Sequence, residues 1–177
     1  MQLQQTIQHD MIYKIILFGE SGVGKTTLVQ RILHDRFNND LKSTIGVELC
    51  IKKTMYANKM VTLSIWDIAG QDRFKALLTN YCIGASAGIL AFNINDINSV
   101  SNFEFWVRTI RERVPNIPIL LVSTKADLGH HRLFSPPKLQ ILMTQWQLYN
   151  YVETSSKLGI GINDLIQRLC HKLVTVD

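Results

Sequence analysis

The sequence predicts an α/β fold in which helices cover both faces of an open sheet. Short apolar runs of strand length alternate with segments of helical periodicity along the whole chain, as in folds built on a parallel sheet. The runs 87–94 and 117–123 are apolar apart from Asn93 and Ser123, which is typical of strands buried on both faces. With 177 residues and no linker or repeat, the chain has room for one domain and its core.

The N-terminal half supplies a strand, a helix and a hairpin. An apolar run at 12–18 ends in a glycine-rich stretch, after which apolar residues such as Leu28 and Ile32 recur at helical spacing. Residues 47–70 then contain two strand-like segments on either side of Ala57 and Asn58, which predicts a hairpin with a tight turn.

The C-terminal half alternates further strands with helices. The predicted elements are strands at 87–94, 117–123 and 151–153 and helices at 99–113, 135–149 and 162–174. Ser135 as N-cap and Pro136 in the first turn favour a helix start at that point. Because ligands of such sheets bind at the carboxyl ends of the strands, the segments that follow each strand are the candidates for a site.

The composition is that of a folded protein with a basic surplus. Apolar residues make up 46% of the chain, which excludes a disordered or fibrous protein. Lys and Arg number 19 against 14 Asp and Glu, a net charge of +5 that suits nucleic acid, an anionic membrane or a phosphate ligand. The basic residues are spread along the chain without an aromatic-interleaved cluster, so nucleic acid is the least favoured partner.

The three cysteines and the N-terminal segment indicate the compartment. Cys50, Cys82 and Cys170 are far apart and form no zinc-binding or disulfide pattern, which favours a reducing, cytoplasmic location. The first ten residues have no signal-peptide character, and no run of 18 apolar residues occurs. The C-terminal residues contain no lipidation motif, so we expect membrane association only if a lipidated tail exists beyond residue 177.

The strongest motif is GESGVGKT at 19–26, which matches the phosphate-binding pattern GxxxxGK[ST]. It lies between a predicted buried strand and a helix, where successive backbone N–H groups and the helix N-terminus can face an anion. Lys25 would contact the β- and γ-phosphates, and the Thr26 hydroxyl would bind Mg²⁺. A glycine-rich turn without a ligand is the alternative, and the strand and helix around the motif argue against it.

Three more segments follow later strands. WDIAGQ places Asp67 at a strand end as a metal-binding carboxylate, with Gly70 near a terminal phosphate and Gln71 able to orient a water. In the segment 124–127, Asp127 can accept from two adjacent N–H donors of guanine, a pair that adenine does not offer. The segment 153–157 can supply backbone N–H groups to a base carbonyl. Each alone is typical of a loop, and their order on successive strand ends is what indicates a nucleotide site.

Residues 12–174 resemble the Ras-like small GTPases, and within them the Rab family. All five nucleotide-binding motifs of these GTPases are present, the fifth being STIG at 43–46, which contains Thr44. The segments 43–49, 64–74 and 80–90 carry the Rab resemblance. It implies a P-loop G domain at 12–174 with a six-stranded, mostly parallel sheet that has one antiparallel strand. Residues 1–11 would form a flexible leader, and no second domain is expected.

The resemblance also implies the ligands and their residues. GTP or GDP with Mg²⁺ would bind, Gln71 and Lys25 would act in hydrolysis, and Phe37 would stack on the guanine. The nucleotide-binding set is Ser21, Gly22, Val23, Gly24, Lys25, Thr26, Thr27, Phe37, Thr44, Gly70, Thr124, Lys125, Asp127, Ser155, Ser156 and Lys157, and the metal ligands are Thr26, Thr44 and Asp67.

The partners implied are effectors, an exchange factor and a GTPase-activating protein. They would bind the switch regions 37–49 and 68–81, with Leu49, Trp66 and Tyr81 as contacts. Trp66 could equally be a core residue, because aromatic side chains are chiefly buried bulk. We expect a cytoplasmic monomer that acts in vesicle trafficking and hydrolyses GTP slowly, because no arginine is placed to act on the phosphates in the way that an activating partner's arginine does.

Several residues depart from the Rab pattern. Thr124 replaces an Asn whose amide ties the segment 124–127 to the phosphate loop at 19–26. Leu41 replaces a tyrosine of the first switch region, 37–49, called switch I. Leu49 and Ile83 change the recognition surface, and Ile68 changes the start of switch II. A nucleotide-locked module with little hydrolysis is therefore an alternative. A P-loop kinase or ATPase is another, although it would have no reason to keep the two base-binding segments.

Overall fold

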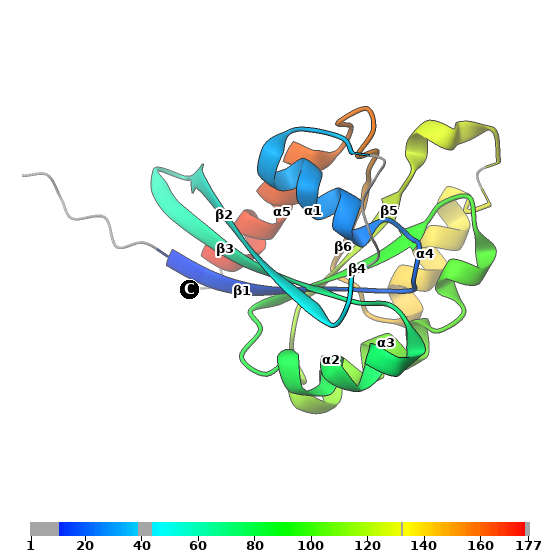
Figure 1. Ribbon diagram of the computed structural model, residues 1–177, viewed down its shortest axis with the longest axis horizontal. Coiled ribbons are helices and arrows are strands. Elements are labelled where there is room, and N and C mark those ends of the chain that lie inside the picture. Colours follow the sequence, from blue (N-terminus) through cyan, green and yellow to red (C-terminus); the bar gives the residue numbers. More distant parts are fainter. Residues whose placement is uncertain (1–10, 39–43, 132, 176–177) are drawn as a thin grey trace, which may run out of the picture.

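Figure 1 shows the computed structural model, which describes residues 11–38, 44–131 and 133–175. Most of the predicted leader and Leu41 lie outside the described residues. The strands are β1 (Met11–Phe18), β2 (Val47–Tyr56), β3 (Lys59–Ile68), β4 (Ala87–Asn93), β5 (Ile119–Thr124) and β6 (Asn150–Glu153). The α-helices of the described residues are α1 (Lys25–His34), α2 (Lys75–Tyr81), α3 (Phe103–Arg113), α4 (Pro136–Gln145) and α5 (Ile162–Val174).

The strands form one sheet in the order β2-β3-β1-β4-β5-β6. All neighbours pair in parallel except β2 and β3, which are antiparallel. This confirms the mostly parallel sheet with one antiparallel strand. The hairpin turn is also confirmed, since Ala57 and Asn58 have φ values of 47° and 61°, the left-handed conformation that a two-residue hairpin turn requires at both positions.

Helices cover both faces of the sheet, as predicted (Figure 1). Residues of α1 and α5, such as Leu28 and Leu169, pack on one face in one apolar cluster. Residues of α2, α3 and α4, such as Leu78, Trp106 and Leu139, pack on the other face in a second cluster. The central strands β1, β4 and β5 are buried between these layers, which explains their apolar sequences.

One helix and two helix boundaries differ from the sequence prediction. The seven-residue helix α2 was not predicted, and its buried Leu78 packs it against the sheet. Helix α3 begins at Phe103, because Ile97–Val100 form a 3-10 turn capped by the Asp96 side chain, which accepts from the Asn98 backbone N–H. Helix α4 ends at Gln145, since Gln147 turns the chain with a φ of 50°. Tertiary packing and local turns override the sequence periodicity at these ends.

Parallel pairing gathers the predicted motifs at one edge of the sheet. Leu17 pairs with Asp67 near the ends of β1 and β3, and Asn93 pairs with Thr124 at the ends of β4 and β5. Glu153 ends β6 beside Ser123. The segments that follow these strands therefore lie together. Within the described residues, no helix is long and apolar enough to cross a membrane.

Candidate functional site

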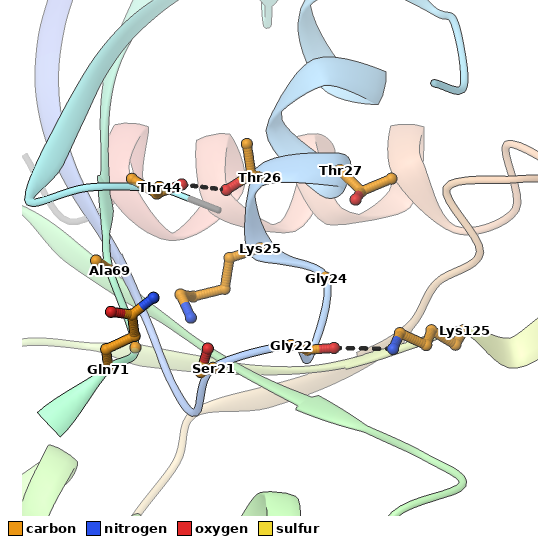
Figure 2. A pocket seen from close by; sticks show the side chains of 11 residues that line it. Ser21, Gly22, Gly24, Lys25, Thr26, Thr27, Thr44, Ala69, Gln71 and Lys125 are labelled. Carbon is orange, nitrogen blue, oxygen red and sulfur yellow. Dashed lines mark hydrogen bonds between the residues drawn. The ribbon is translucent and has the colours of Figure 1, made fainter. Parts of the chain in front are cut away.

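The loop between β1 and α1 lines a cavity of about 220 Å³ (Figure 2), called here the phosphate cavity. Gly24, with a φ of 102°, turns the chain into α1 as its N-cap. The Lys25 side chain reaches back across the loop, where its Nζ donates to the carbonyl oxygens of Gly19 and Glu20 at 2.8 Å each. A cationic group and the N-terminus of a helix thus meet at one point, an arrangement that binds anions.

Burial lowers the pKa of Lys25. Its side chain is nearly buried, and desolvation lowers its pKa to about 8, opposed by the nearby Asp67 and Glu20. A lowered pKa means that the ammonium lacks part of the stabilisation that water would supply. A polyphosphate in the cavity would supply it and raise the pKa of Lys25 again.

Three oxygen-bearing side chains meet beside Lys25. Thr26 Oγ1 donates to Asp67 Oδ2 at 2.6 Å and lies 2.5 Å from Thr44 Oγ1 (Figure 2 draws the Thr26–Thr44 contact). Thr44 Oγ1 lies 3.4 Å from the same Asp67 oxygen. The three candidate metal ligands, which come from α1, switch I and β3, are therefore within reach of one ion.

The environment of Asp67 fits a hard divalent cation. Its side chain is 1% exposed, and among the described residues Oδ1 has no hydrogen-bond partner. Burial raises the pKa of Asp67, although the hydrogen bond from Thr26 and the charge of Lys25 lower it. A buried carboxylate oxygen without a partner is costly, and Mg²⁺ held by hydroxyl and carboxylate oxygens would satisfy it.

Gly70 and Gln71 close the phosphate cavity on the side of β3. A Cβ at Gly70 would lie 2.5 Å from backbone atoms of Gly19, Glu20 and Ser21, so only glycine allows this approach to the phosphate loop. Gln71 lines the same cavity, and its Oε1 accepts from Arg73 Nε at 3.0 Å. Arg73 was not among the residues singled out from the sequence.

A second cavity of about 330 Å³, the base cavity, adjoins the first and shares Gly24, Thr27 and Lys125 with it. Phe37 and Asp127 line it, together with Thr124, Leu128, Ser156 and Lys157.

Hydrogen bonds fix the base loop, the segment 124–127 at the end of β5. Asp127 Oδ1 accepts from the hydroxyl of the fully buried Ser155 at 2.6 Å, which orients the carboxylate. Lys125 has a φ of 60°, and its Nζ donates to the Gly22 carbonyl oxygen at 2.8 Å (Figure 2), so its aliphatic stem spans both cavities.

Thr124 keeps a link between the base loop and the phosphate loop. Its Oγ1 lies 2.5 Å from the Val23 carbonyl oxygen and 3.0 Å from that of Phe92, and the residue is 2% exposed. Thr124 lacks the amide of the Asn that it replaces, and its shorter hydroxyl side chain still reaches the same loop.

Of the nucleotide-binding and metal-binding residues predicted from the sequence, those that do not line a cavity are buried behind one. Val23 supplies the carbonyl that Thr124 contacts, Asp67 bonds Thr26, and Ser155 bonds Asp127. Sequence reasoning missed Ala69 and Leu128 as lining residues, although each lies directly beside a recognised motif.

An aromatic surface is formed by the last residues of the two switch regions, Leu49 and Tyr81, and by Trp66 of β3. Leu49 pairs with Trp66 across β2 and β3, and the rings of Trp66 and Tyr81 have centroids 5.5 Å apart. Leu49 is 53% exposed and Tyr81 36%, whereas Trp66 is partly buried against the apolar core. Lys14 Nζ lies 4.4 Å from the centre of the Trp66 ring and donates to the Ile83 carbonyl oxygen. Trp66 thus serves both the core and the surface.

Comparison with known proteins matches residues 14–175 to the Ras family. The chain belongs to the Ras family. Members of this family are GTPases that bind GTP or GDP together with Mg²⁺, which agrees with the two cavities and the oxygen cluster around Asp67.

Among its relatives are Rab-related proteins. The GTPase is 33% identical to the GTP-binding protein ypt3 of Schizosaccharomyces pombe over 97% of this chain and 80% of the relative. It is 32% identical to the Ras-related protein Rab-13 of Rattus norvegicus over 94% and 82% of the two chains. It is 37% identical to the Ras-related protein rab-11.1 of Caenorhabditis elegans over 84% and 71%. Identities near one third make this GTPase a divergent Rab-like member.

Proposed function

We propose that this protein is a molecular switch that hydrolyses GTP to GDP and binds effectors while GTP is bound. The observation that carries the proposal is the pair of adjoining cavities, which share Gly24, Thr27 and Lys125. One elongated ligand can place its phosphates against Lys25 at one end and its base against Asp127 at the other.

The base cavity favours guanine. A carboxylate has only acceptor oxygens, and guanine presents two adjacent N–H donors on one edge where adenine presents no such pair. Ser155 donates to one oxygen of Asp127 and holds the carboxylate in place. Phe37, which is 37% exposed at the cavity wall, offers a ring for stacking on the base.

The phosphate cavity supports slow hydrolysis. Gln71 lies on its wall, where a neutral amide can orient a water for in-line attack on the γ-phosphate. Lys25 and the backbone N–H groups of the loop counter the charge that develops on the phosphate oxygens. When bound by Thr26, Thr44 and Asp67, Mg²⁺ would neutralise further charge on the β- and γ-phosphates.

An activating partner completes this chemistry. Among the described residues, no arginine lines the phosphate cavity. An arginine supplied by a partner raises such rates by about 10³- to 10⁵-fold.

The aromatic surface of Leu49, Trp66 and Tyr81 is the proposed effector contact. Leu49 and Tyr81 belong to the same switch regions as Thr44 and Gly70, which would hold the γ-phosphate, so loss of that phosphate would relax this surface. The Rab-related names of the relatives favour a role in vesicle trafficking, as a cytoplasmic monomer that reaches membranes peripherally through partners or a lipidated tail.

Two measurements test the function. The nucleotide that copurifies is identified by chromatography, and GTP and ATP are then titrated against the emptied protein with Mg²⁺. We expect a clear preference for GTP and single-turnover hydrolysis slower than about one per second without a partner. A preference for ATP, or faster unassisted turnover, would refute the proposal. Bound GTP that stays intact for many hours would instead favour the nucleotide-locked alternative.

A further inference from the structure

Glu20 belongs to the phosphate loop, yet its side chain is fastened to helix α3. Glu20 Oε1 accepts from Trp106 Nε1 at 2.8 Å and from Asn102 Nδ2 at 3.0 Å. Asn102 is the N-cap of α3, and Trp106 lies one turn later on the same face of the helix. Two donors from α3 therefore converge on one carboxylate oxygen of the loop.

The α3 side of this contact is fixed in the core. Trp106 is fully buried, with its ring centroid 6.3 Å from that of Phe18 and 5.3 Å from that of Phe105. A buried indole N–H needs an acceptor, and hydrogen bonds to a carboxylate are about twice as strong as neutral ones. Because the indole is held by its packing, the contact determines where Glu20 lies.

The backbone of Glu20 touches two groups of the phosphate cavity. Its carbonyl oxygen accepts from Lys25 Nζ at 2.8 Å. Its carbonyl carbon is 2.5 Å from the point where a Cβ on Gly70 would lie, so the Gly70 backbone packs directly on this peptide. A displacement of Glu20 would therefore move the partner of Lys25 and the surface against which Gly70 rests.

We propose that Glu20 is a positioning residue that couples helix α3 to the terminal-phosphate end of the nucleotide site. The inference rests on the proposed function, since it assumes that Lys25 and Gly70 act on the γ-phosphate of GTP. The carboxylate holds the loop in the register at which both groups can reach that phosphate. Release of the carboxylate weakens GTP binding more than GDP binding, because GDP lacks the phosphate in question.

The test compares the dissociation rates of GTP and GDP from matched variants. Glu20→Ala should release GTP about tenfold faster, the loss expected when a charge-assisted hydrogen bond is removed, and change GDP release much less. Glu20→Gln keeps a carbonyl acceptor for both donors and should restore most of the wild-type rate. Glu104→Ala removes a carboxylate of α3 that pairs with Arg108 on the surface, and it should leave both rates unchanged.

A double-mutant cycle shows whether the effect passes through α3. Trp106→Phe keeps the buried ring and removes the N–H donor, so its effect and that of Glu20→Ala should be less than additive. In a Trp66→Phe, Trp146→Phe background, Trp106 is the single remaining tryptophan of the 3 in the chain. Its fluorescence emission should shift in Glu20→Ala and not in Glu20→Gln.

The outcomes distinguish a failure of this inference from a failure of the proposed function. A wild-type protein that binds no guanine nucleotide would overturn both. In a second outcome, the wild-type protein holds GTP, and Glu20→Ala folds and shows the shift in Trp106 emission. If this variant then releases GTP at the wild-type rate, the coupling alone would be overturned. If Glu20→Ala does not fold, Asn102→Ala takes its place, because it removes only one of the two donors to Glu20. Release rates of GTP and GDP from Asn102→Ala that equal the wild-type rates would then overturn the coupling.

Discussion

The Thr124 hydroxyl contacts the Val23 carbonyl oxygen at 2.5 Å, across 101 positions of sequence. This contact ties the loop that follows β5 to the loop that follows β1, so the base cavity and the phosphate cavity keep a constant relation to each other. A single hydroxyl can do this because the residue is buried at the end of β5, where water does not compete for the hydrogen bond.

Removal of this hydroxyl should loosen both cavities. We expect Thr124→Ala to raise the dissociation rates of GTP and GDP alike, by about tenfold, because the Val23 carbonyl loses its buried donor. Thr124→Ser keeps the hydroxyl and serves as the control. Stopped-flow release of a fluorescent nucleotide measures the rates, and equal rates in Thr124→Ala and Thr124→Ser would contradict the link.

Asp127 should determine the choice of base. In Asp127→Asn the new amide presents a donor toward a donor of guanine, so GTP affinity should fall by at least about a hundredfold while xanthosine triphosphate gains. Competition titrations of the two nucleotides check this. An unchanged GTP affinity would remove Asp127 from the base site.

Gln71 should matter for hydrolysis and not for binding. We expect Gln71→Leu to hold GTP with nearly wild-type affinity and to hydrolyse it at least about tenfold more slowly, because the attacking water is no longer oriented. Single-turnover assays with radiolabelled GTP separate the two quantities. Hydrolysis at the wild-type rate would assign the water-positioning role to another group.

The oxygen cluster should make GTP binding depend on Mg²⁺. Chelation of the metal should accelerate GTP release from the wild-type protein, since Asp67 and the phosphates then face each other without a cation. Thr26→Asn should weaken Mg²⁺-dependent GTP binding more than GDP binding. Equal effects on the two nucleotides, measured by titration with and without Mg²⁺, would argue against Thr26 as a metal ligand.

The buried thiols should respond to alkaline pH in a defined direction. Burial raises the pKa of Cys170 from 9.0 to about 11. In the unfolded chain this thiol ionises at lower pH than in the fold, so its contribution to stability is complete below pH 9 and is lost as the pH rises toward about 11.

Urea unfolding measured at pH 8 and pH 10 tests this. The wild-type protein should lose more stability between the two values than Cys170→Ala does. An equal loss of stability in both proteins would contradict the assignment to Cys170.

In the native protein at pH 8, Cys50, Cys82 and Cys170 should react slowly with thiol reagents, because all three are buried and their pKa values are raised.

Prediction from sequence succeeded where the signal is local. The apolar runs predict β1, β4 and β5 because a buried parallel strand needs apolar residues on both faces. GESGVGKT predicts the phosphate loop because only glycines allow its backbone path. Helix α2 escaped prediction, since its seven residues are helical through the packing of Leu78 and not through periodicity.

The order of the motifs, the strands they follow and the family resemblance can all be read from the linear order of the residues. How those motifs are held depends on the three-dimensional fold. Glu20 meets Trp106 across 86 positions of sequence, and the oxygens of Thr26 and Asp67 meet across 41. Such contacts depend on strand order, register and burial, and these are properties of the whole fold that no local pattern of residues encodes.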